Sequence, residues 1–396
     1  MIKGVAVTGM GIISAIGNNT AANYNSLISG KHGISTPEVL KTIHKHLPVG
    51  EIKISNQSLA QNLNLPENHS YTRAALLGAL AVKEAIFQAN LKVDGETGFI
   101  SGTSVGGMDA TETYFKDFLE GNIEHNRYIR AQHPGFTTEK IAEYFEVNGF
   151  VSTISTACSS GANAIMLGAR MIKTGKLKRV IVGGTDCLTK FTLNGFNSLM
   201  ILSNEQCKPF DENRKGLNLG EGAAYLVLEA EEEINGKPVL GRILGYGNAN
   251  DAFHQTASSE NGEGAFLAMQ KALKIAGISA EKIDYINAHG TATKNNDKAE
   301  SAALERIFSN KLPDFSSTKA FTGHTLAAAG ALEAVYSLVA IQNEQVFPNL
   351  NFSNPMLNSG FIPVTNLKEK PINYVLSNSF GFGGNCTSLI FSKNGE

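Results

Sequence analysis

Three residues in this sequence combine a reactive side chain with a local setting that favours chemistry: Cys158, His289 and His324. Cys158 lies in Thr156-Ala-Cys-Ser-Ser-Gly161, between an apolar run and a helical pattern rich in small residues. Free N–H groups and the positive dipole end at a helix start stabilise a thiolate, so this position predicts a lowered thiol pKa. A buried structural cysteine is the alternative that this segment leaves open, because free cysteine is among the most buried residue types.

Both histidines follow strand-like segments at turns. His289 lies in Asn287-Ala-His-Gly-Thr-Ala-Thr293, and the carboxyl end of a strand in a parallel α/β sheet is where ligands bind. His324 closes Lys319-Ala-Phe-Thr-Gly-His324 and precedes a helical pattern with many Ala and Gly residues. Taken singly, each histidine has a structural alternative. His289 can be a loop residue whose ring is hydrogen-bonded within the protein, and His324 can be a helix cap. Together with a thiol, two imidazoles suit acyl transfer followed by stabilisation of an enolate.

A glycine-rich segment, Asn378-Ser-Phe-Gly-Phe-Gly-Gly384, follows strand-like residues 374–377. Backbone N–H groups in such a turn can form part of an oxyanion hole. A nucleotide-binding loop is the alternative interpretation. It is disfavoured because no Lys-Ser/Thr pair follows the glycines, as it does in a phosphate loop.

The elements that must position these groups alternate between short apolar runs and longer helical patterns, which predicts an α/β fold. We expect a strand that ends near residue 156 and further strands at 5–8, 97–101, 179–183, 223–228, 242–246, 283–288, 374–377 and 388–391. We expect helices at 73–90, 158–174, 264–276 and from near 324 to 343. The order of elements repeats, so we predict two packed halves, 1–235 with a polar insertion at 102–150, and 236–396.

Composition limits the class of protein. With 396 residues, 42% hydrophobic and 18% charged, the chain can bury a large core. A net charge of −2 gives no indication of nucleic acid binding. Four cysteines without metal-ligand spacing fit a reduced, cytoplasmic protein. We see neither a signal peptide's apolar core at the start nor a run of about 18 apolar residues, so no membrane span is expected.

Taken together, the motifs resemble the β-ketoacyl-acyl carrier protein synthases of the elongating, synthase II-like type, over essentially the whole chain. The matching segments are Val7 to Gly11, Gly102 to Gly107, Thr156 to Ser160, Pro209-Phe-Asp211, Gly220 to Ala223, the two histidine motifs and the final glycine segment. The resemblance implies a thiolase-like fold, with duplicated halves in a five-layered αβαβα core. It also implies an acyltransferase that joins an acyl group to a malonyl thioester by decarboxylative Claisen condensation, in fatty acid or polyketide chain elongation.

The resemblance implies a role for each matching residue in the reaction centre. Cys158 would carry the acyl chain as a thioester. His289 and His324 would promote decarboxylation of the malonyl thioester and stabilise the enolate. Lys319 would support the His324 site electrostatically, and Glu333 would hold the surrounding helix in place.

The remaining implied residues bind and gate the substrate. The amides of Phe382 and Cys158 would form the oxyanion hole, and the Phe382 ring would gate the acyl pocket. Thr291, Thr293 and Phe380 are the expected substrate-binding residues. No cofactor or metal is implied, because the phosphopantetheine belongs to the acyl carrier protein. That protein and a second subunit, in a homodimer or in a heterodimer with a related synthase-like chain, are the implied partners.

The final motif departs from the family pattern. Many relatives have Gly-Gly-Thr-Asn where this sequence has Gly383-Gly-Asn-Cys386. The segment 128–144 and the loop 202–208 also differ from the primary fatty acid enzymes, which favours a specialised synthase, for example for polyene or aryl-polyene pigment chains. The alternatives are a non-catalytic chain-length partner subunit, a thiolase-type acyltransferase on coenzyme A esters with Cys386 as a second cysteine, and an initiating synthase with asparagine in place of His324.

An acidic carrier protein would be guided by a basic patch. The candidates are Lys173, Lys176, Lys178, Arg179, Lys208 and Arg214. Each of them is explained equally well as a solvated surface residue.

Overall fold

The computed structural model describes residues 4–309, 311–357 and 360–393. Among them a ten-stranded mixed sheet runs in the order β10-β9-β13-β14-β8-β1-β7-β6-β4-β5. One half of the sheet consists of five strands from the N-terminal part of the chain: β1 (Val5–Ser14), β4 (Thr97–Gly102), β5 (Val151–Ile154), β6 (Arg179–Asp186) and β7 (Gly222–Ala230). The other consists of β8 (Gly241–Asn250), β9 (Tyr285–Asn287), β10 (Asp314–Ser316), β13 (Tyr374–Phe380) and β14 (Asn385–Ser392). The two halves meet where β1 pairs briefly with β8, at Ala6–Arg242 and Val7–Gly241.

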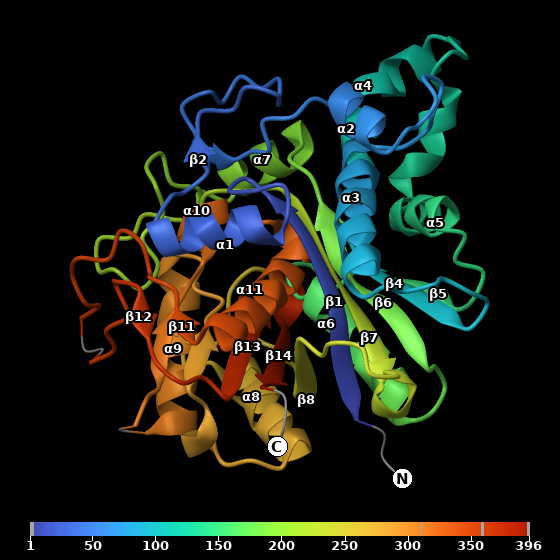
Figure 1. Cartoon of the computed structure of the whole chain (residues 1–396). Helices are drawn as coiled ribbons and strands as arrows, with labels where there is room; N and C mark the ends of the chain where they lie inside the picture. Colours follow the sequence, from blue (N-terminus) through green and yellow to red (C-terminus); the bar gives the residue numbers. More distant parts are fainter. Residues whose placement is uncertain (1–3, 310, 358–359, 394–396) are drawn as a thin grey trace.

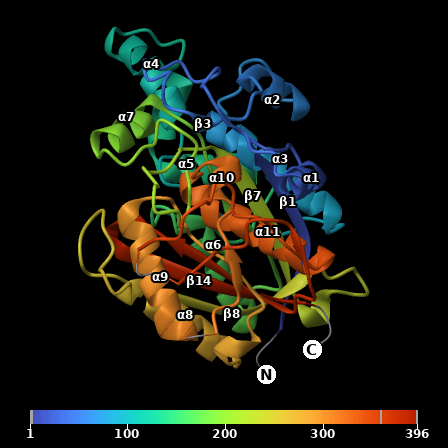
Figure 2. The same ribbon diagram turned by 90° about the vertical axis from the view of Figure 1, so that its left-hand side faces the viewer.

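Helices lie between the two halves of the sheet and also cover their outer faces (Figures 1 and 2). Helix α3 (Arg73–Gln88) packs on β1, β6 and β7. Helices α6 (Ser160–Lys173) and α11 (Ala329–Asn343) lie between the two halves of the sheet. They contact β6 and β7 of one half and β8 and β14 of the other. Helix α8 (Glu263–Ala276) covers β8 and β14, with α9 (Lys294–Phe308) beside it. This arrangement confirms the expected five-layered αβαβα core.

The predicted strands and helices are all present, with bounds that shift by a few residues. The predicted helix at 158–174 begins at Ser160, and the helix expected from near His324 begins at Ala329, after a 3-10 turn, η4 (Leu326–Ala328). The remaining elements are α1 (Thr20–Ser29), β2 (Ile34–Ser35), β3 (Val49–Gly50), α2 (Asn56–Asn62), α7 (Lys190–Ser198), η2 (Glu231–Glu233), η3 (Ala280–Lys282), α10 (Lys319–Thr322), β11 (Gln345–Val346), β12 (Lys368–Glu369) and η5 (Phe382–Gly384).

The middle-layer helix α11 is apolar on nearly all sides because a sheet face covers it on each side. In the described part of the chain, Leu326–Asn343 is the one helical stretch that is long and apolar enough to cross a membrane. Of the residues in this stretch, 89% are buried inside the protein, and the core helix of a folded protein can have the same length and composition. The stretch contains Glu333 and ends in Gln342 and Asn343, so it is not a run of 18 apolar residues, and its position in the core explains its hydropathy.

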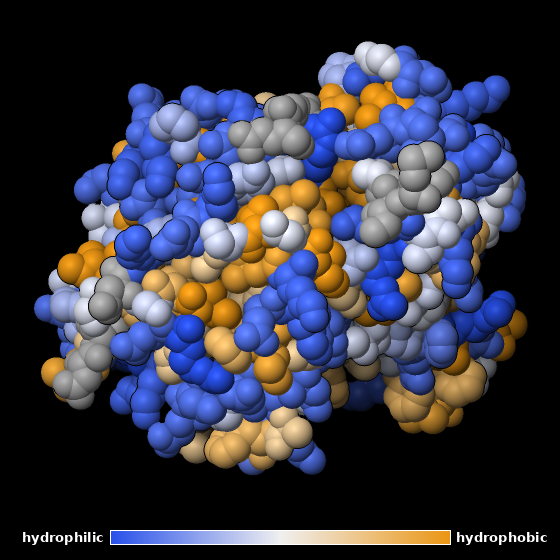
Figure 3. Space-filling view, turned by 90° about the horizontal axis from the view of Figure 1, so that it is seen from below, coloured by the Kyte–Doolittle hydropathy of each residue, from blue (hydrophilic) through white to orange (hydrophobic). Residues whose placement is uncertain are grey.

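The polar insertion folds into α4 (Met108–Leu119), the 3-10 helix η1 (Asn126–Gln132) and α5 (Pro134–Tyr144). Helix α4 projects from the layered core at the upper right of Figure 1. The insertion precedes β5, which is an edge strand of the sheet. Seen from below, the molecule has a mainly hydrophilic rim, and hydrophobic residues gather toward the middle of that face (Figure 3).

Candidate active site

A cavity of about 760 Å³ brings together the three residues with reactive side chains. Cys158, His289 and His324 all line it. His289 follows β9, and the turn from Gly381 to Gly384 follows its parallel neighbour β13, so both lie at the same end of these strands. The imidazole rings of His289 and His324 lie 5.4 Å apart, centroid to centroid, at an interplanar angle of 85°. The predicted convergence of one thiol and two imidazoles is thus present.

The thiol of Cys158 is buried, with 6% of the residue exposed. Burial raises its pKa to about 11, and this effect outweighs the opposing effects of the Lys319 charge and of the backbone N–H groups of Phe382 and Cys158. The prediction of a lowered pKa was therefore wrong. Burial disfavours the charged thiolate more strongly than the helix start, the Lys319 charge and the two N–H groups favour it. At neutral pH the side chain is a thiol, so attack by the sulfur requires that its proton be transferred.

This pKa gives a direct prediction for alkylation of the free enzyme. The rate of Cys158 modification by iodoacetamide should rise about tenfold per pH unit from pH 7 to 9.5, because only the thiolate reacts. A free thiol such as glutathione, measured in parallel, should level off near its ordinary pKa of about 8.5. Peptide mass spectrometry locates the adduct, and a Cys158 rate that levels off below pH 8 would contradict the prediction.

Both imidazoles are neutral near pH 7. Burial lowers the pKa of His289 and of His324 well below the ordinary value, and the positive charge of Lys319 lowers both further. A neutral imidazole has one N–H donor and one acceptor nitrogen. Among the described residues, neither Nδ1 has a hydrogen-bond partner. The tautomer of each ring can therefore be set by the molecule that enters the cavity.

Lys319 and Glu333 form a buried ion pair behind these rings. The Lys319 ammonium also donates a hydrogen bond to the main-chain carbonyl of His289, at 2.5 Å. Burial raises the pKa of Glu333 to about 7 although Lys319 opposes this shift. Lys319 therefore contacts the His289 segment directly, in addition to the electrostatic effect on His324 that was expected.

Replacement of Lys319 by methionine should destabilise the protein by about 3–5 kcal/mol, because it leaves the Glu333 carboxylate buried without its partner. The free energy of unfolding from urea denaturation measures this. The double variant Lys319→Met/Glu333→Leu should recover most of the loss, and Lys311→Met, which breaks an exposed pair with Glu281, should cost at most about 1 kcal/mol. A double variant as unstable as the single one would contradict the account.

The turn that begins at Gly381 brings a second backbone donor to the sulfur. A Cβ on Gly381 would lie 2.8 Å from the Thr156 carbonyl oxygen and 3.1 Å from the Cys158 nitrogen, so only glycine allows this approach. The backbone N–H groups of Phe382 and Cys158 both donate toward the Cys158 sulfur. Two converging N–H donors are what an oxyanion hole requires. The Phe382 ring stacks on Phe196 of α7, with centroids 5.6 Å apart.

The expected substrate-binding residues line the same cavity. The hydroxyl oxygens of Thr291 and Thr293 are 3.0 Å apart, and the Phe380 ring lies 5.5 Å from the His289 ring. Phe382 also lines the cavity, while Lys319 and Glu333 lie behind its wall. Every predicted site residue is thus in or directly behind one cavity.

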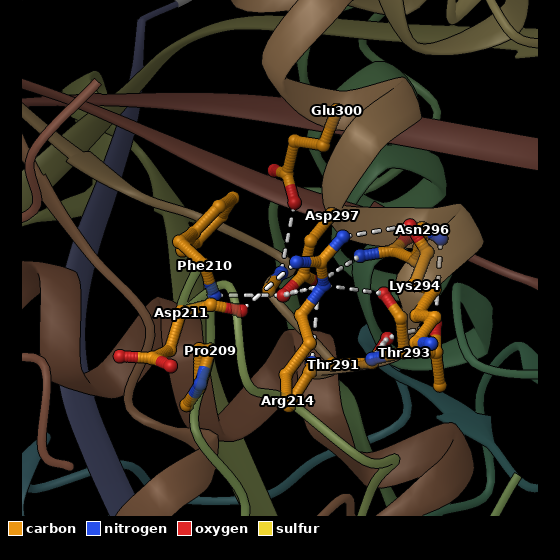
Figure 4. A network of polar contacts seen from close by, with 12 residues as sticks. Pro209, Phe210, Asp211, Arg214, Thr291, Thr293, Lys294, Asn296, Asp297 and Glu300 are labelled. Carbon is orange, nitrogen blue, oxygen red and sulfur yellow. Dashed lines mark hydrogen bonds and ion pairs between the residues drawn. The ribbon is translucent and has the colours of Figure 1, made fainter. Parts of the chain in front are cut away.

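Sequence reasoning missed the residues that hold the His289 segment, which Figure 4 shows in part. Glu300 on α9 accepts the backbone N–H groups of His289 and Gly290, at 2.9 and 2.8 Å. Asp297, one turn earlier, accepts those of Ala292 and Phe210, at 3.1 and 2.7 Å. These two carboxylates fix the main chain from which His289 and the two threonines project.

Arg214 completes this network. Its guanidinium lies 3.7 Å from an Asp297 oxygen and donates hydrogen bonds to the carbonyl oxygens of Asp211, Thr293 and Lys294 (Figure 4). The sequence signal that could have revealed these residues is Thr293, a residue type that favours the N-cap of a helix. Thr293 accepts the N–H of Asn296 and begins α9, a helix that was not predicted and whose first two turns carry Asp297 and Glu300.

The six basic candidates do not form one patch. Lys173 lies at the C-terminal end of α6, about 20 Å along the helix from the end next to Cys158. Lys178 and Arg179 pair with acidic residues there, and Arg214 is buried. These candidates therefore do not support a docking patch at the cavity, because those near the end of α6 lie away from it and Arg214 is a buried member of the network described above. Lys215 and Lys294 line the cavity instead.

Comparison with known families agrees with this geometry. The family description "Beta-ketoacyl synthase, N-terminal domain" matches residues 3–233, and "Beta-ketoacyl synthase, C-terminal domain" matches residues 240–353. The chain belongs to the β-ketoacyl synthase family. It is therefore a condensing enzyme of the acyltransferase class, and synthases of this family use the phosphopantetheine of their carrier-protein substrate, with no cofactor of their own.

Relatives of this β-ketoacyl synthase match it over the full length. It is 35% identical to the "Putative 3-oxoacyl-[acyl-carrier-protein] synthase, mitochondrial" of Schizosaccharomyces pombe, over 99% of each chain. It is 32% identical to "3-oxoacyl-[acyl-carrier-protein] synthase 2" of Staphylococcus aureus strain N315, over 99% of this chain and 98% of the relative.

Solved ketosynthase structures superpose closely on this synthase. "The ishigamide ketosynthase/chain length factor" gives a TM-score of 0.94 at 28% identity, over 100% of each chain. The "Ketosynthase (ApeO) in Complex with its Chain Length Factor (ApeC) from Xenorhabdus doucetiae" gives 0.85 at 31% identity, over 98% of each chain. These likenesses confirm the thiolase-like fold.

Proposed function

We propose that Cys158 takes an acyl chain from acyl carrier protein and that the enzyme extends it by two carbons with a malonyl thioester. One observation carries this proposal: a single cavity holds a thiol, two neutral imidazoles and two N–H donors directed at the sulfur. A thiol nucleophile suits acyl transfer, and the imidazoles suit stabilisation of an enolate.

In the first half-reaction the Cys158 sulfur attacks the carbonyl carbon of the acyl thioester. A bond forms from carbon to the Cys158 sulfur, and the bond from carbon to the pantetheine sulfur breaks. The N–H groups of Phe382 and Cys158 stabilise the negative oxygen of the tetrahedral intermediate. The proton of the Cys158 thiol passes to the departing pantetheine sulfur, and a neutral imidazole, on His289 or His324, can carry it.

In the second half-reaction a malonyl thioester occupies the cavity and its thioester carbonyl oxygen accepts N–H donors from His289 and His324. The bond to the carboxylate breaks, carbon dioxide leaves, and the electron pair forms an enolate that these donors stabilise. The enolate carbon attacks the acyl thioester on Cys158. A carbon–carbon bond forms, the bond from the acyl carbon to the Cys158 sulfur breaks, and the sulfur takes up a proton from solvent.

The other site residues have positioning and binding roles in this proposal. Lys319, paired with Glu333, holds the His289 segment through its carbonyl, and the Lys319 charge adds to the effect of burial in keeping both imidazoles neutral. Thr291, Thr293 and Phe380 line the path of the pantetheine arm.

We further propose that the enzyme acts in the cytoplasm with acyl carrier protein and a second subunit. Similar solved structures include a ketosynthase in complex with its chain length factor and a ketosynthase in complex with its acyl-carrier protein. Strand β5 is an edge strand, and its first residue Val151 and the preceding Phe150 are both partly exposed, so this edge suits pairing with another chain. A homodimer and a heterodimer with a related chain both fit, as does a role in polyene or aryl-polyene synthesis. We also propose 1–235 and 236–396 as the two thiolase-like halves.

The test is incubation of the purified protein with acyl- and malonyl-loaded carrier proteins, followed by mass spectrometry. We expect an acyl adduct on Cys158 and a product two carbons longer. Unloaded carrier protein in place of the malonyl form should give the adduct alone. An acyl group on another cysteine, or no extended product, would refute the proposal.

A further inference from the structure

The segment in which this sequence departs from many relatives makes contacts that the proposed mechanism does not use. Asn385 is the first residue of β14 and directly follows η5. Its side-chain oxygen accepts N–H groups from Asn163 on α6 and from Asn248 on β8, each at 2.8 Å. The hydroxyl oxygen of Ser159 lies 2.8 Å from the same atom and donates its one proton either there or to the Thr156 carbonyl.

Asn163 connects this oxygen to the turn that bears the nucleophile. One of its N–H groups bonds Asn385, and the other bonds the hydroxyl oxygen of Thr156 at 2.9 Å, two residues before Cys158. Its side-chain oxygen accepts the hydroxyl of Thr387 at 2.8 Å. Asn163 is only 5% exposed, so water cannot readily replace a lost bond.

The two turns that this bridge joins each supply one donor of the oxyanion hole. The Cys158 N–H comes from a turn in which Ala157 has a φ of 51°, ahead of the first residue of α6. The Phe382 N–H comes from a turn with Gly383 at 80°, ahead of the first residue of β14. Neither donor therefore lies in an α-helix or a strand, and the two come from distant parts of the chain.

We propose that Asn385 and Asn163 are positioning residues that hold the Cys158 and Phe382 donors in register for acyl transfer. The inference rests on the proposed function. Small displacements of oxyanion-hole donors reduce rates strongly, because their stabilising effect depends on distance to the developing charge. The decarboxylation step uses the two imidazoles and does not depend on this alignment.

The experiment compares two reactions in the Asn385→Leu variant: acylation of Cys158 by acyl carrier protein, and release of carbon dioxide from malonyl carrier protein. We expect acylation to fall by about ten- to a hundredfold while carbon dioxide release changes by less than about twofold. The matched control is Asn23→Leu. Asn23 is buried, whereas Asn385 is half-buried, and the Asn23 side-chain oxygen accepts hydrogen bonds from Ser14 and Tyr336. Asn23 does not line the cavity, so both rates should change alike.

A second variant keeps the proposal testable if Asn385→Leu does not fold. Asn385→Thr introduces the residue that many relatives carry and retains one shorter acceptor. It should slow acylation by at least about threefold and leave carbon dioxide release unchanged. Equal losses in both reactions, or unchanged acylation, would overturn the inference. Absence of an adduct in the natural protein would instead refute the proposed function itself.

Discussion

Replacement of Cys158 by alanine should remove condensing activity by at least about a thousandfold, because it removes the sulfur toward which the N–H groups of Phe382 and Cys158 are directed. Mass spectrometry of the carrier-bound product measures the loss. The effect should be on chemistry and not on folding, because the buried sulfur is small and alanine fits the same space. The circular dichroism spectrum and thermal midpoint of the variant should therefore stay close to those of the natural protein.

The matched control for this variant is Cys386→Ala. Cys386 lines the same cavity, and burial raises the pKa of its thiol to about 12. It should retain acylation to within about threefold, since a condensing enzyme uses one nucleophilic sulfur. Comparable losses in the two variants would favour thiolase-type chemistry with two cysteines. Full activity of the Cys158→Ala protein within a complex would instead identify the chain as a non-catalytic partner.

Replacement of either His289 or His324 by alanine should separate the two half-reactions. Decarboxylation and condensation should fall by about a hundred- to ten-thousandfold, because each ring supplies a donor to the enolate. Acylation of Cys158 should remain within about tenfold, because the remaining imidazole can still carry the proton. Release of carbon dioxide and formation of the protein adduct, followed in the same sample, measure the two steps.

A third histidine provides the control for these variants. His254 lines the outer part of the cavity and is exposed. His254→Ala should leave both half-reactions within about twofold. Loss of acylation without loss of decarboxylation in the His289 or His324 variants would contradict the division of roles between the sulfur and the imidazoles.

Local sequence patterns predicted the main elements and the site residues because the reactive groups lie at turns with strong local signals. Gly381 and Gly383 mark a turn in which one close approach and one positive φ require glycine, and such positions can be read without a structure. Cys158 and His289 likewise stand next to runs of strand-like or small residues. These features depend on neighbours in the chain.

Features that depend on distant parts of the chain could not be predicted in this way. The pKa of Cys158 is set by how completely other layers exclude water, so the local helix start indicated the wrong direction. Helix α9 was missed because its first turns carry Asp297 and Glu300, charged residues whose partners lie in other segments. The basic candidates near Lys173 failed for the same reason, since Lys173 lies at the far end of α6 from the turn that carries Cys158.

The apolar stretch Leu326–Asn343 has a consequence for biogenesis. Strands β13 and β14, which cover one side of α11, are synthesised after it. In a nascent chain, the apolar surface of α11 that these strands cover therefore stays exposed until both strands have left the ribosome. We therefore expect a product truncated before residue 374, which lacks both strands, to aggregate instead of folding into a smaller stable unit.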